Sequence, residues 1–129
     1  MQLVSVRIIT ADLQRIVPFY ERITGIPITM LSDDFGELRT AACTLAIGST
    51  RTLAFFDGEI ARPAENRTAI LEFRVDDVDA VFERLADFIA PCLVQAPKTM
   101  PWGNRSLLFR DPDGNLINFF TPGAPPRAD

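Results

Sequence analysis

The sequence contains no histidine. Histidine is the commonest side-chain ligand of transition metals and the commonest general base at neutral pH, so both kinds of chemistry lose their usual residue. Only two cysteines are present, Cys43 and Cys92, and they lie far apart with no CxxC spacing. We interpret each as a small buried hydrophobic residue rather than half of a disulfide or a nucleophile, which favours a reducing, cytoplasmic location.

Long apolar runs and an excess of basic residues are also missing. No segment approaches the roughly 18 apolar residues that a membrane helix needs, and Arg7 interrupts the start of the chain, which argues against a signal peptide. Thirteen basic side chains stand against seventeen acidic ones, a net charge of −4, whereas a nucleic-acid-binding protein needs a basic surplus. No glycine-rich phosphate-binding motif occurs. We therefore expect neither a membrane nor a nucleic acid as partner.

The composition is that of an ordinary globular protein, with 47% hydrophobic and 23% charged residues in a chain of 129. The sequence also contains an internal repeat. Residues 5–20 align with residues 70–85 at an offset of 65 positions. In each copy an apolar run leads to an aspartate, Asp12 or Asp77, that is suited to cap a helix. A second match, of 53–56 with 117–120 at an offset of 64, supports two copies of one supersecondary unit.

Each unit is predicted to contain a strand, a helix and three further strands. The patterns place these elements at residues 3–10, 12–24, 27–32, 36–47 and 51–56 in the first unit, and at 68–76, 78–87, 92–97, 106–110 and 115–121 in the second. Pro18 lies inside the first helix and predicts a kink or a loose first turn there. Residues 57–67 form a polar linker. The sequence Asp111-Pro112-Asp113-Gly114-Asn115 predicts a tight turn between two strands, with a structural role for its aspartates.

Two such units, the DDVD helix start, the hairpin LFRDPDGNLINFF and the PWG segment before it resemble the vicinal oxygen chelate superfamily. This superfamily includes glyoxalase I, extradiol dioxygenases, fosfomycin-resistance enzymes and bleomycin-binding proteins. The resemblance covers residues 1 to about 122. It implies an α+β fold in which two βαβββ modules, about 1–57 and 67–122, form curled mixed sheets with helices on their outer faces and make a single domain with a tail at 123–129. It also implies a homodimer.

The resemblance further implies a metal held by His or Glu on the first and last strands of each unit. The matching positions here are Ser5, Ala54, Ile70 and Asn118. A hydroxyl, an amide and two aliphatic side chains cannot hold a divalent transition metal firmly. The sequence therefore predicts no metal cofactor, and it argues against metal-dependent glyoxalase or dioxygenase activity.

Strand alternation predicts which side chains share a cavity with these four positions. The added candidates are Arg7, Phe56, Glu72, Arg74 and Phe120, and the opposite strand faces are apolar and are expected to pack on the helices. A mostly apolar cavity with a few polar groups is typical of a small-molecule site.

The charged and aromatic candidates leave alternatives open. Glu72 is expected to pair with Arg7 or Arg74 as a structural bridge, to lie with them at a solvated rim of the cavity, to meet a cationic ligand, or to act as a general base. Either arginine is suited to an anionic or carbonyl group of a ligand. Trp102, the only tryptophan, lies in a loop, where it would either stack on a planar ligand or cover its own core.

Two main classes of function follow, and an interaction or regulatory module with an empty cavity is a third alternative. The first is a metal-independent protein that binds and sequesters a small molecule, an antibiotic or a metabolite, without a cofactor. The second is a metal-free lyase or isomerase of the same fold, with Glu72 as a weak candidate base and Arg7 or Arg74 holding an oxyanion. The sequence ranks binding first because no catalytic constellation is evident.

Overall fold

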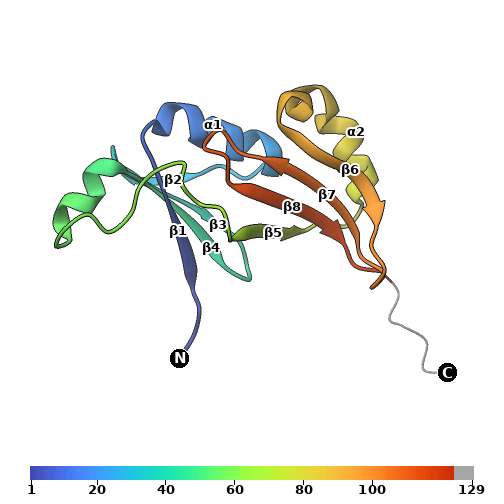
Figure 1. The fold of residues 1–129 in the computed structure, drawn as a ribbon, viewed down its shortest axis with the longest axis horizontal. Coiled ribbons are helices and arrows are strands. Elements are labelled where there is room, and N and C mark those ends of the chain that lie inside the picture. Colours follow the sequence, from blue (N-terminus) through green and yellow to red (C-terminus); the bar gives the residue numbers. More distant parts are fainter. Residues whose placement is uncertain (124–129) are drawn as a thin grey trace. The chain divides into compact units, whose positions relative to one another are not determined.

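The computed structural model describes residues 1–123 (Figure 1). The chain forms two compact units, Met1–Asn66 and the residues from Arg67 onward. Each unit has the predicted order of strand, helix and three strands. The first contains β1 (Ser5–Thr10), α1 (Leu13–Thr24), β2 (Thr29–Ser32), β3 (Phe35–Arg39), β4 (Thr44–Ser49) and a 3-10 helix, η1 (Thr50–Phe55). The second contains β5 (Ile70–Arg74), α2 (Val78–Ile89), a 3-10 turn η2 (Ala90–Cys92), β6 (Leu93–Thr99), β7 (Arg105–Arg110) and β8 (Leu116–Thr121).

Each unit forms its own mixed four-stranded sheet. The strand orders are β1-β4-β3-β2 and β5-β8-β7-β6, and in both sheets the first strand runs parallel to the last one while the other pairs are antiparallel. The helix between the first two strands makes the parallel pairing possible, because parallel neighbours need a long crossover connection. The predicted α+β class with two mixed sheets is confirmed.

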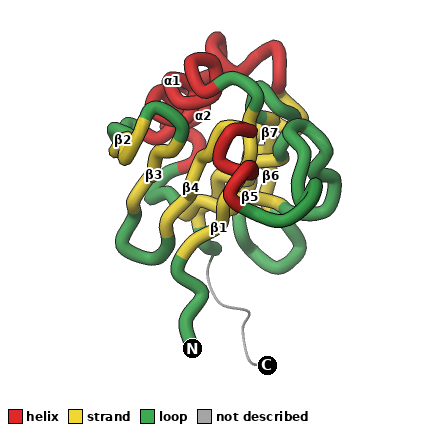
Figure 2. The backbone as a smooth tube through the Cα atoms, turned by 90° about the vertical axis from the view of Figure 1, so that its left-hand side faces the viewer, coloured by secondary structure: helices red, strands yellow, loops and turns green. Residues whose placement is uncertain are grey.

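The helices pack on the apolar face of their own sheets, α1 against β4 and α2 against β6, β7 and β8. Figure 2 shows the helices in red and the strands in yellow. The buried side chains of α1 include Phe19 and Tyr20, which belong to the core of the first unit. The helix continues through Pro18 to Thr24, and Gly25 ends it in the left-handed conformation at a φ of 70°. Glycine adopts this conformation without a steric penalty, which explains why the helix ends there.

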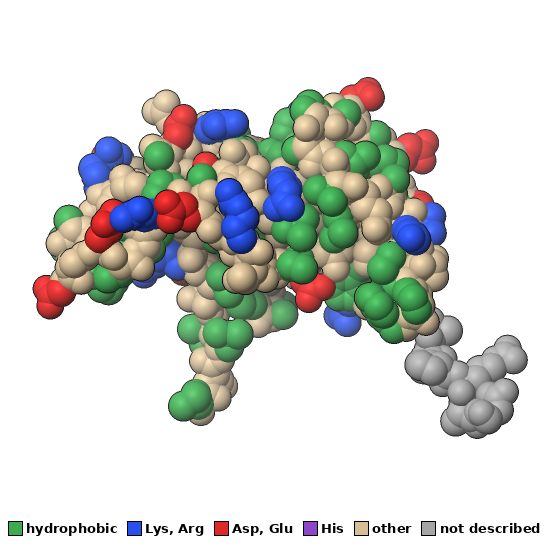
Figure 3. All heavy atoms as spheres, viewed as in Figure 1, with side chains coloured by type: hydrophobic (Ala, Val, Ile, Leu, Met, Phe, Trp, Pro, Cys, Tyr) green, Lys and Arg blue, Asp and Glu red, His purple; other side chains and the backbone are tan. Residues whose placement is uncertain are grey.

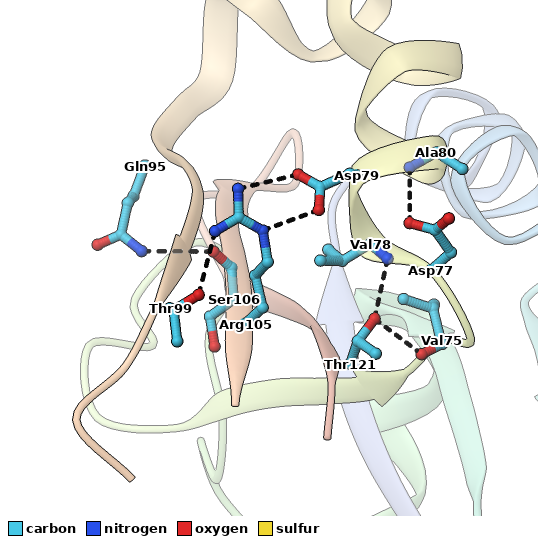
Figure 4. Close-up of polar contacts among 10 residues, drawn as sticks. All are labelled: Val75, Asp77, Val78, Asp79, Ala80, Gln95, Thr99, Arg105, Ser106 and Thr121. Atoms are coloured by element: carbon cyan, nitrogen blue, oxygen red, sulfur yellow. Dashed lines mark hydrogen bonds and ion pairs between the residues drawn. The ribbon is translucent and has the colours of Figure 1, made fainter. Parts of the chain in front are cut away.

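Hydrogen bonds fix the start of α2 to its sheet (Figure 4). The Asp77 carboxylate accepts from the Ala80 N–H at 3.1 Å, and the Thr121 hydroxyl on β8 accepts from the Val78 N–H at 2.8 Å. The guanidinium of Arg105 donates two hydrogen bonds, of 2.8 and 3.0 Å, to the Asp79 carboxylate. In α1 the corresponding cap is different, because the side chain of Asp12 makes no capping hydrogen bond.

Two predicted strands of the first unit were wrong. Residues 36–47 form two strands, β3 and β4, separated by a turn, and residues 51–56 form most of η1 rather than a strand. The Ser49 hydroxyl accepts from the Arg51 N–H at 3.2 Å and donates to the Asp34 carboxylate at 2.8 Å, which caps η1 and turns the chain out of the sheet. Hydrogen bonds from Ser49 and Arg51 lower the pKa of Asp34.

This correction changes how the two units align. The offset of 65 positions is confirmed from β1 to β5 and from α1 to α2, but the last strands β4 and β8 align at an offset of 72, so that Ala46 corresponds to Asn118. The match of 53–56 with 117–120 was coincidental. The second unit has 26 residues between its helix and its last strand against 19 in the first, mainly because β6 and its connection to β7 are longer.

Of the predicted tail, 124–129 lie outside the described residues. Within the described part of the chain, no helix is long and apolar enough to cross a membrane. On the face shown in Figure 3, basic and acidic side chains are interspersed rather than gathered into a block of one sign.

Candidate ligand-binding faces

Each sheet has one face covered by its helix and one face open. Along β5 the exposure alternates as predicted: Ile70, Glu72 and Arg74 are exposed, whereas Leu71 and Phe73 between them are half-buried. On β8, Ile117 and Phe119 are buried on the helix side. The open face of the second sheet therefore carries two of the charged candidates, Glu72 and Arg74, and its other face forms the core.

The structure brings two of the predicted residues together on this open face, beside the β5 edge of the sheet. Glu72 and Asn118 are directly opposite one another on β5 and β8, and the Asn118 Nδ2 donates to the Glu72 Oε2 at 2.9 Å. The Oδ1 atom of Asn118 is buried and has no hydrogen-bond partner. A buried acceptor without a donor is unfavourable by about 1–3 kcal/mol, so this pair is not explained as a device for stability.

Glu72 does not form the structural bridge that was one of the alternatives. Among the described residues it makes no ion pair with Arg7 or Arg74, and Asn118 is its hydrogen-bond partner. Arg74 is exposed on the same face, one row along the sheet from Glu72 and opposite Phe120. The open face of the second sheet therefore presents the Glu72 carboxylate and the Arg74 guanidinium, which form no ion pair with each other.

Apolar side chains frame the Glu72–Asn118 pair. Ile70, which is 50% exposed, lies opposite Leu116 on one side of the pair, and Phe120 lies on the other. Leu108 on β7 is opposite Asn118 and is half-buried. Polar groups surrounded by partly exposed apolar surface are typical of small-molecule sites.

The open face of the first sheet is built around Arg7. The Arg7 guanidinium carbon lies 5.0 Å from the centroid of the Phe35 ring, although β4 lies between their strands. Ala46 and Gly48 are the β4 residues that pair with Arg7 and Phe35, and their small size leaves room for this contact. A cation held over an aromatic ring is stabilised electrostatically.

Two predicted candidates, Ala54 and Phe56, are placed differently by the structure. Ala54 and Phe56 lie in and just after η1, so the strand register that placed them beside the others was wrong, and Ala46 is the residue at the corresponding position of the sheet. Trp102 is 65% exposed in the turn between β6 and β7, and it does not cover the core of its own unit. Ser5 is exposed on β1, two positions before Arg7 on the same face.

Sequence reasoning missed Phe35 and Leu108. Phe35 precedes the misplaced strand at 36–47, and only the pairing of β3 with β4 shows that it faces Arg7. Leu108 belongs to the predicted strand 106–110, and strand alternation alone could have placed it on the face of Asn118.

The positions at which the family resemblance expects a metal do not fit one. They carry Ser5, Ala46, Ile70 and Asn118, of which only the hydroxyl and the amide have lone pairs, and neither is an anionic or imidazole ligand. No group of three or more His, Cys, Asp or Glu side chains within residues 1–123 is arranged to hold a metal ion.

The cysteines add no nucleophile to either face. Both are free thiols and both are half-buried. Burial raises the pKa of the Cys92 thiol, which keeps it in the less reactive protonated form.

We expect Asn118→Leu to change the free energy of unfolding by less than about 1 kcal/mol, because the lost hydrogen bond to Glu72 is offset by removal of a buried acceptor that has no donor. Urea denaturation measures the change. Asn115→Leu is the matched control and should lower stability, since the buried Asn115 amide donates to Asp111 at 2.7 Å. A loss of stability in Asn118→Leu equal to that of the control would show that Asn118 serves the fold.

Comparisons with known proteins agree with this architecture. The sequence pattern of the Glyoxalase/Bleomycin resistance protein/Dioxygenase superfamily matches residues 2–119. The uncharacterized protein YraH of Bacillus subtilis (strain 168) is 28% identical over 125 residues, which are 93% of this chain and 98% of that protein. A protein of unknown function from Agrobacterium tumefaciens str. C58 superposes with a TM-score of 0.78 at 26% identity and covers 94% of each chain. A glyoxalase-related enzyme from Fulvimarina pelagi superposes with a TM-score of 0.76 at 19% identity, over 99% of each chain. The family match extends over most of the chain, and the protein is therefore a member of the Glyoxalase/Bleomycin resistance protein/Dioxygenase superfamily.

Proposed function

We propose that the protein binds a small organic molecule, an antibiotic or a metabolite, without the help of a metal ion. The observation that carries this proposal is the replacement of the family's metal-ligand positions by Ser5, Ala46, Ile70 and Asn118. These residues contribute hydrogen bonds and apolar contacts, so an occupant of the open faces is held by shape, by hydrogen bonds and by the nearby charges.

The Glu72–Asn118 pair indicates which part of a ligand the second sheet would hold. The Glu72 carboxylate uses one oxygen to accept from Asn118, and its other oxygen remains available as an acceptor. The apolar frame of Ile70, Leu116 and Phe120 supports contact with hydrocarbon or aromatic groups. A ligand with an N–H donor or a cationic amine beside an apolar body matches both features.

Native mass spectrometry and metal analysis of protein purified without added metal test the first part of the proposal. We expect substoichiometric metal, and the same spectrum reports any retained small molecule and tests the expected homodimer. Stoichiometric zinc, nickel, manganese or iron that binds at Asn118 and is lost in Asn118→Leu would contradict the proposal.

A screen of antibiotics and metabolites by fluorescence tests the second part, because Trp102 is the only tryptophan. We expect saturable quenching by a compound that is recovered unchanged, and at least tenfold weaker binding in Glu72→Gln, the loss of about 1.4 kcal/mol of interaction. Glu83→Gln on the exposed side of α2 is the matched control and should bind normally. Conversion of the compound that persists in chelator and disappears in Glu72→Gln would instead identify a metal-free enzyme.

A further inference from the structure

Arg7 shares a row of the first sheet with a carboxylate and yet has no ion pair with it. Arg7, Ala46 and Glu37 form one row across β1, β4 and β3, so that the two opposite charges flank a single alanine on the same face of the sheet. Nevertheless, Arg7 makes no ion pair or hydrogen bond from its side chain within the part of the chain that the structure describes. Its guanidinium lies over the Phe35 ring instead.

Glu37 is paired with a second arginine instead. The Arg39 Nη2 and Nε atoms both donate to the Glu37 Oε1, at 2.8 and 3.3 Å. Phe35 and the small β4 residues Ala46 and Gly48 meanwhile provide a surface on which the Arg7 side chain can lie flat. Arg7 is thus held in place by a ring contact that uses none of its N–H donors.

A guanidinium that is positioned but has unused donors is suited to a planar anion. Its N–H groups form a fork that matches the two oxygens of a carboxylate. A doubly charged phosphate is disfavoured at this position, because it would need more positive charge than one unpaired guanidinium provides. The Glu37 carboxylate in the same row would also repel it. The aromatic ring also favours ligands whose carboxylate is attached to a flat apolar group.

We propose that Arg7 and Phe35 form a subsite for the carboxylate of an organic acid. The proposal deepens the proposed function and rests on it, since it assigns a chemical class to one part of the bound molecule. It concerns the open face of the first sheet only, and it does not depend on Glu72 or Asn118.

The test uses sodium benzoate as the probe and follows the arginine side-chain Nε–H signals of the ¹⁵N-labelled full-length protein by NMR. We expect a saturable shift of the Arg7 signal with a dissociation constant on the order of 1 mM, as for one bidentate contact at an exposed site. Benzamide, which has the same shape but no charge, and inorganic phosphate should bind at least tenfold more weakly.

Variants separate the parts of the subsite. When Arg7 itself is replaced, the backbone amide signals around Ala46 report benzoate binding. We expect Arg7→Gln to abolish the benzoate-induced shift of these signals. Arg7→Lys should weaken benzoate binding at least fivefold, because lysine lacks the planar fork. Phe35→Leu should weaken binding about threefold by releasing the guanidinium. Arg39→Gln should also weaken it, since it frees Glu37 to pair with Arg7, whereas Arg15→Gln on α1 is the control and should change nothing.

Three results would overturn the subsite: no saturable shift with benzoate, equal binding of benzamide, or undiminished binding in Arg7→Gln. These results would leave the proposed function standing if the fluorescence screen still finds a compound that Glu72→Gln fails to bind. Benzoate binding at Arg7 with no compound found in that screen would support the carboxylate subsite and count against the Glu72 face.

Discussion

Replacing Asp111 with alanine is expected to lower the free energy of unfolding by about 3 kcal/mol. Asp111 is 4% exposed at the start of the turn between β7 and β8. Its Oδ1 accepts from the N–H groups of Asp113 and Asn115 at 2.8 and 2.9 Å, and its Oδ2 accepts from the Asn115 side chain at 2.7 Å. Alanine would leave three donors without their acceptor inside a turn that sets the register of two core strands.

The measurement is urea denaturation followed by circular dichroism. Asp113→Asn in the same turn is the matched control. The Oδ2 of Asp113 is buried without a hydrogen-bond partner, so replacing this oxygen with an amide nitrogen breaks no hydrogen bond. We expect the control to unfold within about 0.5 kcal/mol of the unmodified protein. Equal destabilisation by both variants would mean that the turn depends on its negative charge rather than on the hydrogen bonds of Asp111.

Phe119→Ala is expected to cost about 4 kcal/mol, the typical loss for truncating a buried aromatic side chain. Phe119 is 2% exposed on the helix side of β8, and its ring makes edge-to-face contacts with Phe73 and Phe109 at centroid distances of 5.3 and 5.2 Å. The cavity would open on the helix side of β8, where α2 packs against the sheet.

The adjacent residue provides the control for this prediction. Phe120 points to the opposite face of the sheet and is only half-buried, so Phe120→Ala should cost less than half as much in the same denaturation experiment. It should instead weaken binding of any compound found in the fluorescence screen. If Phe120→Ala destabilised the protein as much as Phe119→Ala, the face described as open would be part of the core.

Much of the second unit could be predicted from the sequence because its signals are local. The alternation along β5 and β8 gives the two faces of the sheet correctly, and the turn from Asp111 to Asn115 carries the proline and glycine that such turns require. The positive φ of Gly114, 84°, confirms the reason for its glycine. These features depend on neighbouring residues, which a sequence displays directly.

The error in the first unit has a physical cause. The turn between β3 and β4, residues 40–43, contains no glycine, proline, asparagine or aspartate, and it is held by the Thr40 hydroxyl, which donates to the Cys43 carbonyl at 2.6 Å and accepts from the Cys43 N–H at 3.2 Å. Without a turn signal, two strands looked like one long strand. The following apolar segment then took the place of the last strand, although Ser49 caps it as a 3-10 helix.

The candidate faces were predictable only in part for a related reason. Glu72 and Asn118 were both assigned to the correct face, but their hydrogen bond depends on the register of β5 against β8, which joins residues 46 positions apart. The contact of Arg7 with Phe35 depends in addition on a strand that was misplaced. Strand alternation gives the direction of a side chain, whereas its partner is set by pairing between distant segments.

Because the two sheets are separate, the first unit is able to fold while the rest of the chain is still being synthesised on the ribosome. Each sheet takes all four of its strands from one unit, and the last strand of the first sheet ends at Ser49. All the pairings of that sheet can therefore form before β5 has been synthesised, without waiting for the carboxyl-terminal half. Nascent chains stalled at increasing lengths should acquire protease resistance in two steps, the first of them soon after residue 66 has left the exit tunnel.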